Sequence, residues 1–186
     1  MIGMDWYFSN KNTDSKSDIM ESNDDRILSI IEQIPEKYKK MYFNKTYIYY
    51  EYEFGSRRDV IILDNVVFKI PKEDNKEEGR KSNITEMKFY KKYGKKKDLG
   101  KCYYCSENGD ILIMKRYNEV FSDNSTKLAK YILKHYKNDP FMLSDFNISN
   151  WGCDENGKIV KIDYGEEDYM KYYDLNSIKW YANNNE

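Results

Sequence analysis

Long apolar runs are absent from this chain of 186 residues, and its first residues lack the apolar stretch of a signal peptide. We therefore expect no membrane span and a cytoplasmic location, or delivery into a host cytosol. Cysteine is scarce, and three cysteines form no disulfide framework, which favours a reducing compartment. A net charge of −1 excludes a general attraction to polyanions, so we expect no nucleic-acid or membrane partner.

Acidic and amide side chains gather between residues 143 and 165. Asp145 is followed five residues later by Asn150, and Asp163 comes eighteen residues after Asp145. Asn156-Gly157 predicts a tight turn between them, because both central residues of such a turn need a positive φ. A hairpin closed by this turn returns Asn150 and Asp163 to one end, with Asp145 on the loop beside them. Two carboxylates and an amide oxygen suit a magnesium ion held against phosphate oxygens.

This arrangement resembles the catalytic core of the protein-kinase family. Asp145 and Asn150 match the Asp-x-x-x-x-Asn of the catalytic loop, and Asp163-Tyr164-Gly165 matches the Asp-x-Gly of the metal-binding turn. The resemblance implies that Asp145 accepts the proton of a substrate hydroxyl and that Asn150 and Asp163 bind Mg²⁺. The residues alone also allow a polar β-hairpin with Asx turns.

Alternating residues predict three strands before this stretch, over 46–53, 59–63 and 66–70. In the family, a glycine-rich loop covers the phosphates of ATP, and a lysine on the third strand holds them. Gly55 and Lys69 match those places, and Ser56 and the Arg57-Arg58 pair offer further donors. The loop has one glycine where the family usually has three. Gly55 also suits an ordinary hairpin turn, and Lys69 also suits a solvent-facing position.

A helix is predicted over residues 83–93. In the family, the helix after the third strand carries a glutamate that pairs with the strand lysine. Glu86, seventeen residues after Lys69, is the best match and joins the catalytic set. Glu86 can instead close a capping box at the start of its own helix. Glu77 and Glu78 are further candidates if the helix starts earlier.

Two more strands, over residues 100–105 and 110–115, are predicted on either side of Asn108-Gly109. The residues that follow resemble the fifth strand and the hinge of the family. Met114 would then guard the back of the adenine pocket, and backbone groups of Lys115, Arg116 and Tyr117 would bind the adenine edge. The implied cofactors are ATP and Mg²⁺, and the complete nucleotide-binding set is Gly55, Ser56, Arg57, Lys69, Met114, Lys115, Arg116 and Tyr117.

The resemblance implies an α+β, protein-kinase-like fold with two lobes: an antiparallel five-stranded small lobe and a much reduced helical large lobe. We expect a polar N-terminal tail over 1–23, the small lobe with an N-terminal helix over 24–117, and the reduced large lobe with the catalytic and metal-binding loops over 118–186. Since 21 residues follow Gly165, we expect the activation segment and the substrate-docking helices to be missing.

The implied function is that of a minimal protein kinase of bacterial effector or phage type, which phosphorylates protein hydroxyls and has a protein substrate or a host protein as its partner. Two alternatives stay open. One is a kinase-like binding or inhibitor protein without transfer activity, which the single-glycine loop favours. The other is a small-molecule kinase of the aminoglycoside-phosphotransferase type, which shares the Asp-x-x-x-x-Asn pattern.

Overall fold

The computed structural model describes residues 7–10, 29, 32, 34–42, 47–54, 56–62, 65–120 and 125–184, which form a mixed α+β structure. Its strands are β1 (Tyr7–Asn10), β2 (Tyr47–Phe54), β3 (Arg58–Ile62), β4 (Val66–Pro71), β5 (Cys102–Cys105), β6 (Leu112–Lys115), β7 (Asn118–Glu119), β8 (Trp151–Cys153) and β9 (Ile159–Lys161). Its α-helices are α2 (Glu36–Tyr42), α3 (Lys76–Tyr93), α4 (Ser125–Tyr136), α5 (Pro140–Leu143) and α6 (Leu175–Asn184). Short 3₁₀ helices lie at Glu73–Asn75, Ile148–Asn150 and Tyr169–Tyr172.

The larger sheet has the strand order β1-β2-β3-β4-β6-β5. In this order, each pair of neighbouring strands from β2 through β3, β4 and β6 to β5 is antiparallel, while β1 pairs with β2 in parallel. The predicted five-stranded small lobe is therefore not confirmed, because β1 adds a sixth strand from within the segment predicted as a polar tail. The rest of that segment, 1–6 and 11–23, lies outside the described residues.

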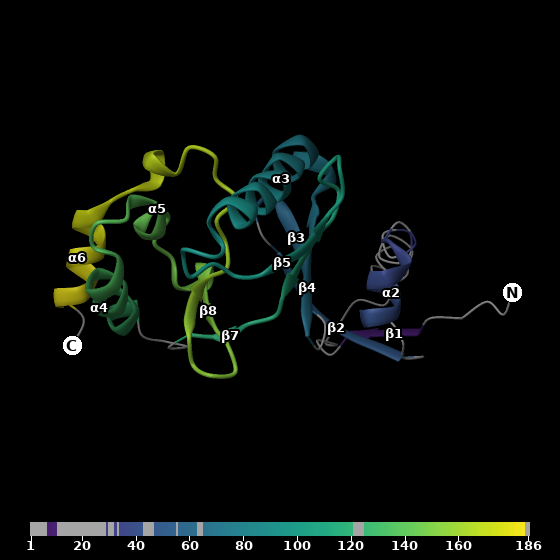
Figure 1. The fold of residues 1–186 in the computed structure, drawn as a ribbon, viewed down its shortest axis with the longest axis horizontal. Helices are drawn as coiled ribbons and strands as arrows, with labels where there is room; N and C mark the ends of the chain where they lie inside the picture. Colours follow the sequence, from purple (N-terminus) through teal and green to yellow (C-terminus); the bar gives the residue numbers. More distant parts are fainter. Residues whose placement is uncertain are drawn as a thin grey trace, which may run out of the picture.

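Helix α3 crosses the larger sheet and contacts β4 and β5 (Figure 1). It ends at Tyr93, as predicted, but it begins at Lys76 rather than at Asn83. Asn83 is fully buried in the middle of the helix, where its amide donates to the carbonyls of Lys69 and Gly109. The capping box is therefore wrong, because tertiary contacts use the Asn83 side chain.

The smaller sheet has the order β7-β8-β9, and its β8–β9 hairpin lies where it was predicted. The turn differs from the predicted one, because Gly157 has a positive φ and Asn156 does not. Gly157 has a φ of +76°, a conformation that a side chain disfavours. The Asp154 carboxylate accepts from the backbone N–H groups of Asn156 and Lys158 and fixes the turn. The two ends of the hairpin are joined by the Ile162 N–H, which donates to the Asn150 carbonyl over 2.8 Å.

Helices α4, α5 and α6 lie in the other half of the molecule from α3, beyond the smaller sheet (Figure 1). Apolar residues on one face of α4 predict its packing, and Leu128 and Ile132 are fully buried in the core together with Ile178 of α6. Removing such a side chain from water contributes about 1.5–3 kcal/mol. These contacts fix α5 and the loop that follows it, which carries Asp145.

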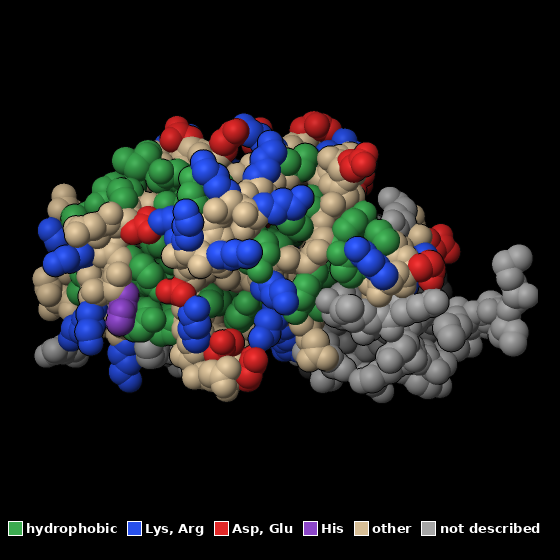
Figure 2. Space-filling model, in the orientation of Figure 1, with side chains coloured by type: hydrophobic (Ala, Val, Ile, Leu, Met, Phe, Trp, Pro, Cys, Tyr) green, Lys and Arg blue, Asp and Glu red, His purple; other side chains and the backbone are tan. Residues whose placement is uncertain are grey.

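Charged side chains of both signs are interspersed on the face shown in Figure 2. This agrees with the balanced composition of 31 basic and 32 acidic residues. Within the described part of the chain, no helix combines the length and the apolar character needed to cross a bilayer.

Candidate functional site

Asp145 follows α5 at the start of a short loop and has a φ of +46°, which is unusual for a residue with a side chain. Asp139 begins α5 by accepting from the Met142 N–H, and the Asp145 N–H donates to the Tyr172 carbonyl over 2.9 Å. The surrounding contacts thus hold a disfavoured backbone conformation, which is common at functional sites. The side chain that this conformation presents is exposed.

Asn150 ties the Asp145 loop to the β8–β9 hairpin. Its amide nitrogen donates to the Asp145 carboxylate over 2.9 Å and to the Asp145 carbonyl over 3.0 Å. The Asn150 carbonyl accepts from Ile162, next to Asp163. Asp145, Asn150 and Asp163 therefore lie close together in the structure. Because the Asn150 amide nitrogen donates to Asp145, the amide oxygen of Asn150 is the atom that could bind a cation.

Lys69 and Glu86 form a buried ion pair. The Lys69 ammonium lies 3.0 and 3.2 Å from the two Glu86 carboxylate oxygens, and it donates to the Ile162 carbonyl over 2.9 Å. It also lies 3.8 Å from an Asp163 carboxylate oxygen. Glu86 is fully buried, and Lys69 is 7% exposed. The alternative of a solvent-facing Lys69 is therefore wrong, and Glu86 rather than Glu77 or Glu78 is its partner.

Arg58 is a fourth charged residue of this cluster, beside Lys69, Glu86 and Asp163, and the sequence did not place it there. Its guanidinium lies 3.0 Å from Glu86, 2.9 Å from Asp163 and 3.1 Å from the Asn83 amide oxygen. Arg58 was predicted to donate to phosphate together with Arg57, but in this structure it is held by carboxylates. The alternation of side chains along β3 is the sequence signal that could have placed Arg58 in this cluster, because it puts Arg58 on the same face of the strand as Val60 and Ile62.

Burial and charge have opposite effects on the carboxyl groups of this cluster. Burial raises the pKa of Glu86, although Arg58 and Lys69 beside it act in the other direction. Burial also opposes ionisation of Asp163, but Lys69 and Arg58 hold its pKa below the usual range. Asp163 is thus kept as a carboxylate, and 42% of its side chain is exposed. An ionised, accessible carboxylate is able to bind a cation.

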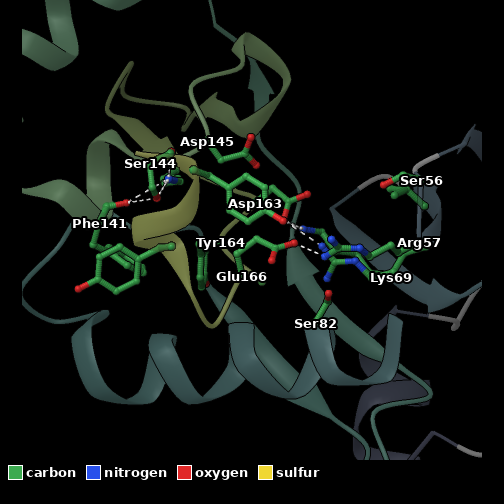
Figure 3. A pocket seen from close by; sticks show the side chains of 16 residues that line it. Ser56, Arg57, Lys69, Ser82, Phe141, Ser144, Asp145, Asp163, Tyr164 and Glu166 are labelled. Atoms are coloured by element: carbon green, nitrogen blue, oxygen red, sulfur yellow. Dashed lines mark hydrogen bonds and ion pairs between the residues drawn. The ribbon is translucent and has the colours of Figure 1, made fainter. Parts of the chain in front are cut away.

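Two cavities meet at this cluster and share Val60, Lys69 and Asp163 in their walls. The larger cavity has a volume of about 640 Å³ and lies between the larger sheet and the β8–β9 hairpin. The smaller has about 260 Å³ and contains Asp145. Figure 3 shows the smaller cavity, with Asp163 between Asp145 on one side and Lys69 and Arg57 on the other.

The predicted nucleotide-binding residues are divided between these cavities. Those of the strand and hinge line the larger cavity together with Asn150, namely Lys69, Met114, Lys115, Arg116 and Tyr117. Ser56 and Arg57 line the smaller cavity. Arg57 forms an ion pair with Glu166, so its charge is already matched. Gly55 lies outside the described residues.

Lys161 is a buried cation near Asp145 that sequence reasoning missed. It is 1% exposed and donates to the carbonyls of Phe141 and Ser144 and to the Ser144 hydroxyl. Burial lowers its pKa to about 8. These bonds fasten β9 to the start of the Asp145 loop. A lysine at the end of a strand is usually exposed, so the sequence held no signal for this role.

The two cavities and the residues in their walls fit ATP and Mg²⁺. The volume of the larger cavity falls within the range of ordinary ligand sites, and its apolar wall of Val60, Ile62, Val67 and Met114 suits a flat base. Lys69 at its inner end suits phosphate oxygens. The Asn150 amide oxygen and the Asp163 carboxylate are the hard oxygen ligands that Mg²⁺ takes beside phosphates.

Comparison with known proteins leaves the family open. No protein-family model matches the chain, and no curated protein matches it. Among solved structures, it is similar to the bifunctional kinase-methyltransferase WbdD, at 17% identity and a TM-score of 0.44 over 59% of this chain. A second crystal structure of WbdD and its co-crystal structure with the kinase inhibitor LY294002 give 16% and 17% identity and TM-scores of 0.44 and 0.43. The matched part of this chain spans 29–31% of those proteins.

Proposed function

We propose that this chain is a protein-kinase-like phosphotransferase, which binds ATP across the two cavities and transfers a phosphoryl group to a hydroxyl in the presence of Mg²⁺. The observation that carries the proposal is the position of the Lys69 ammonium. It lies 3.0 Å from the buried Glu86 and 3.8 Å from Asp163, which adjoins the linked pair of Asp145 and Asn150. Side chains from four separate parts of the sequence thus converge on one place.

Each residue of this cluster has its own role in the proposed transfer. Lys69, oriented by Glu86, binds the α and β phosphates. Asp145 orients the acceptor hydroxyl and accepts its proton. Asn150 and Asp163 would hold Mg²⁺, which supplies neutralisation of the charge on the transferred group. Phosphoryl transfer depends mainly on positioning and on charge stabilisation, so few residues suffice.

The base of the nucleotide belongs in the larger cavity. Met114 is 2% exposed and closes the cavity from within β6. Lys115, Arg116 and Tyr117 follow it along the wall, where backbone N–H and C=O groups meet the edge of a base. The Lys115 N–H donates to the Lys101 carbonyl, and the Arg116 N–H donates to the Asn65 carbonyl. The hydrogen bonds to the base would therefore come from other backbone groups of this segment.

We propose a protein as the acceptor. The smaller cavity, at about 260 Å³, gives the acceptor hydroxyl access to Asp145 but little volume in which to enclose a whole small molecule beside the phosphates. A serine, threonine or tyrosine side chain of a partner protein reaches Asp145 without being enclosed. A host protein or another protein of the same cell can supply it.

A second candidate is a nucleotide-binding protein that does not transfer phosphate. The observation that favours it is the contact of 2.9 Å between Arg58 and Asp163, which sets a positive charge against the carboxylate assigned to the metal. Transfer activity separates the two candidates, because both predict that ATP binds.

The test is transfer of labelled γ-phosphate from ATP to mixed proteins and, in parallel, to small hydroxyl compounds. We expect labelling of protein that falls by about 10²-fold or more in Asp145→Asn and in Asp163→Ala. Asp74→Asn, which changes an exposed carboxylate outside both cavities, is the matched control and keeps the activity of the unaltered chain. Activity that survives Asp163→Ala would contradict the metal assignment, and label on small compounds alone would contradict a protein acceptor.

A further inference from the structure

Arg58 occupies a fixed place at the junction of the two cavities. One of its terminal nitrogens lies between Glu86 and Asp163, at 3.0 and 2.9 Å, and the other donates to the Asn83 amide oxygen. Asn83 is itself held by the carbonyls of Lys69 and Gly109. The guanidinium is therefore oriented by two buried contacts, with Glu86 and Asn83, and by a partly buried contact with Asp163, and Arg58 is part of the wall of the smaller cavity.

Glu86 does not need Arg58 for charge balance, since Lys69 already contacts both of its oxygens. With Arg58, the cluster contains two cations, Arg58 and Lys69, and two carboxylates, those of Glu86 and Asp163. The positive charge of Arg58 lies against the half-exposed Asp163. A cation 2.9 Å from that carboxylate opposes the binding of a divalent ion to the same carboxylate before any phosphate is present. The same cation attracts the phosphates of a nucleotide, because guanidinium groups bind phosphate oxygens well.

We propose that Arg58 is a phosphate-binding residue that takes the place of a divalent ion, so that this chain binds ATP without metal and needs Mg²⁺ only for transfer. The inference rests on the proposed nucleotide site. When ATP binds, the phosphates and Asp163 share the guanidinium, and Lys69, whose ammonium lies 3.8 Å from an Asp163 carboxylate oxygen, supplies the second positive charge. A purely structural Arg58 would leave the metal dependence of ATP binding unchanged when it is replaced.

The experiment measures the affinity for ATP by calorimetry, once with EDTA and once with MgCl₂, for the unaltered chain, Arg58→Gln and Asp163→Asn. Arg80→Gln is the matched control, because Arg80 also pairs with two carboxylates, Glu77 and Asp110, and lies outside both cavities. We expect the unaltered chain to bind ATP in EDTA with an affinity within about threefold of that in MgCl₂.

Arg58→Gln should bind ATP about tenfold more weakly in EDTA, and much of this loss should be recovered in MgCl₂. Asp163→Asn should bind ATP several-fold more tightly in EDTA, because Arg58 is released from its carboxylate and turns fully to the phosphates. Arg80→Gln should match the unaltered chain under both conditions. Melting curves establish that each variant is folded, and Asp163→Asn decides the question if Arg58→Gln does not fold.

Each other outcome overturns the inference. The inference fails if the unaltered chain binds ATP only with Mg²⁺, if Arg58→Gln and the unaltered chain bind ATP equally in EDTA, or if Asp163→Asn loses metal-free binding. In each of these cases, ATP binding in MgCl₂ would leave the proposed function intact. Absence of ATP binding by the folded, unaltered chain under both conditions would overturn the proposed function as well.

Discussion

Individual charged residues determine whether this site can form, and Glu86 depends most on its partners. Its carboxylate is fully buried and is matched by Lys69 and Arg58. A buried charge is tolerated only when its partners and hydrogen bonds are in place. The family resemblance, in which Glu86 is the best-placed glutamate after Lys69, predicted their pairing. The position of Arg58 between Glu86 and Asp163 was not predicted, because the sequence shows a pair of arginines but not which of them is buried.

Replacing Glu86 by Ala should destabilise the chain by about 3–5 kcal/mol, because Arg58 and Lys69 would then share only the half-exposed Asp163. The control is Glu78→Ala in the first turn of the same helix, an exposed position where we expect a change within about 0.5 kcal/mol. Chemical denaturation measures both. Equal effects of the two substitutions would show that Glu86 is not the buried partner of the two cations.

The pH dependence of stability should reveal the buried charge of Lys161. Burial lowers its pKa from 10.5 to about 8, so between these values the unfolded chain holds more protons than the folded chain. The free energy of unfolding of the unaltered chain should therefore rise, relative to Lys161→Met, by about 3 kcal/mol as the pH increases through this range.

The same comparison with Lys158→Met is the control for Lys161. Hydrogen bonding to Asp98 raises the pKa of Lys158, so its difference from the unaltered chain should not rise over this range. Urea denaturation at a series of pH values measures both differences. A flat difference for Lys161→Met would contradict a buried, charged lysine beneath the Asp145 loop.

At the scale of elements, tight turns were predictable and the start of α3 was not. Asn-Gly pairs indicated the positions of both hairpins, although in each turn the Gly, and not the Asn before it, has the positive φ. The residues at the start of α3 are charged and lack a helical apolar pattern, so they read as a linker between β4 and a later helix. Contacts of the buried Asn83 and Gly79 with the sheet, which no local pattern shows, explain the true boundary.

The glycines of the two hairpin turns should respond differently to replacement by Ala. Gly157 has a φ of +76° with open space where a Cβ would lie, so Gly157→Ala should cost about 1–2 kcal/mol from backbone strain alone. A Cβ on Gly109, which has a φ of +80°, would lie 2.4 Å from the Arg80 carbonyl oxygen. Gly109→Ala should therefore cost more, and thermal melting of both variants measures the difference. Equal costs would contradict the close approach of α3 to this turn.

At the scale of the whole molecule, polar contacts join the larger sheet and α3 to the residues after the β8–β9 hairpin. Arg58 and Lys69 reach Asp163, and Lys69 also binds the Ile162 carbonyl. The Gly100 N–H donates to the Lys161 carbonyl over 2.7 Å. The sequence indicated that Lys69 and Asp163 lie together, but it did not indicate that Arg58 joins them or that the site is divided into two cavities, since both depend on how the parts pack.

The most direct test of the account is the affinity for ATP in MgCl₂ of the unaltered chain and of Lys69→Met, measured by calorimetry. Lys69→Met leaves Glu86 paired with Arg58, so the variant should stay folded. We predict saturable binding at one site by the unaltered chain and binding at least about tenfold weaker by Lys69→Met, a loss of about 1.4 kcal/mol or more. Equal affinities of the two proteins, or no saturable binding by the folded, unaltered chain, would contradict a nucleotide site built around Lys69 and Asp163.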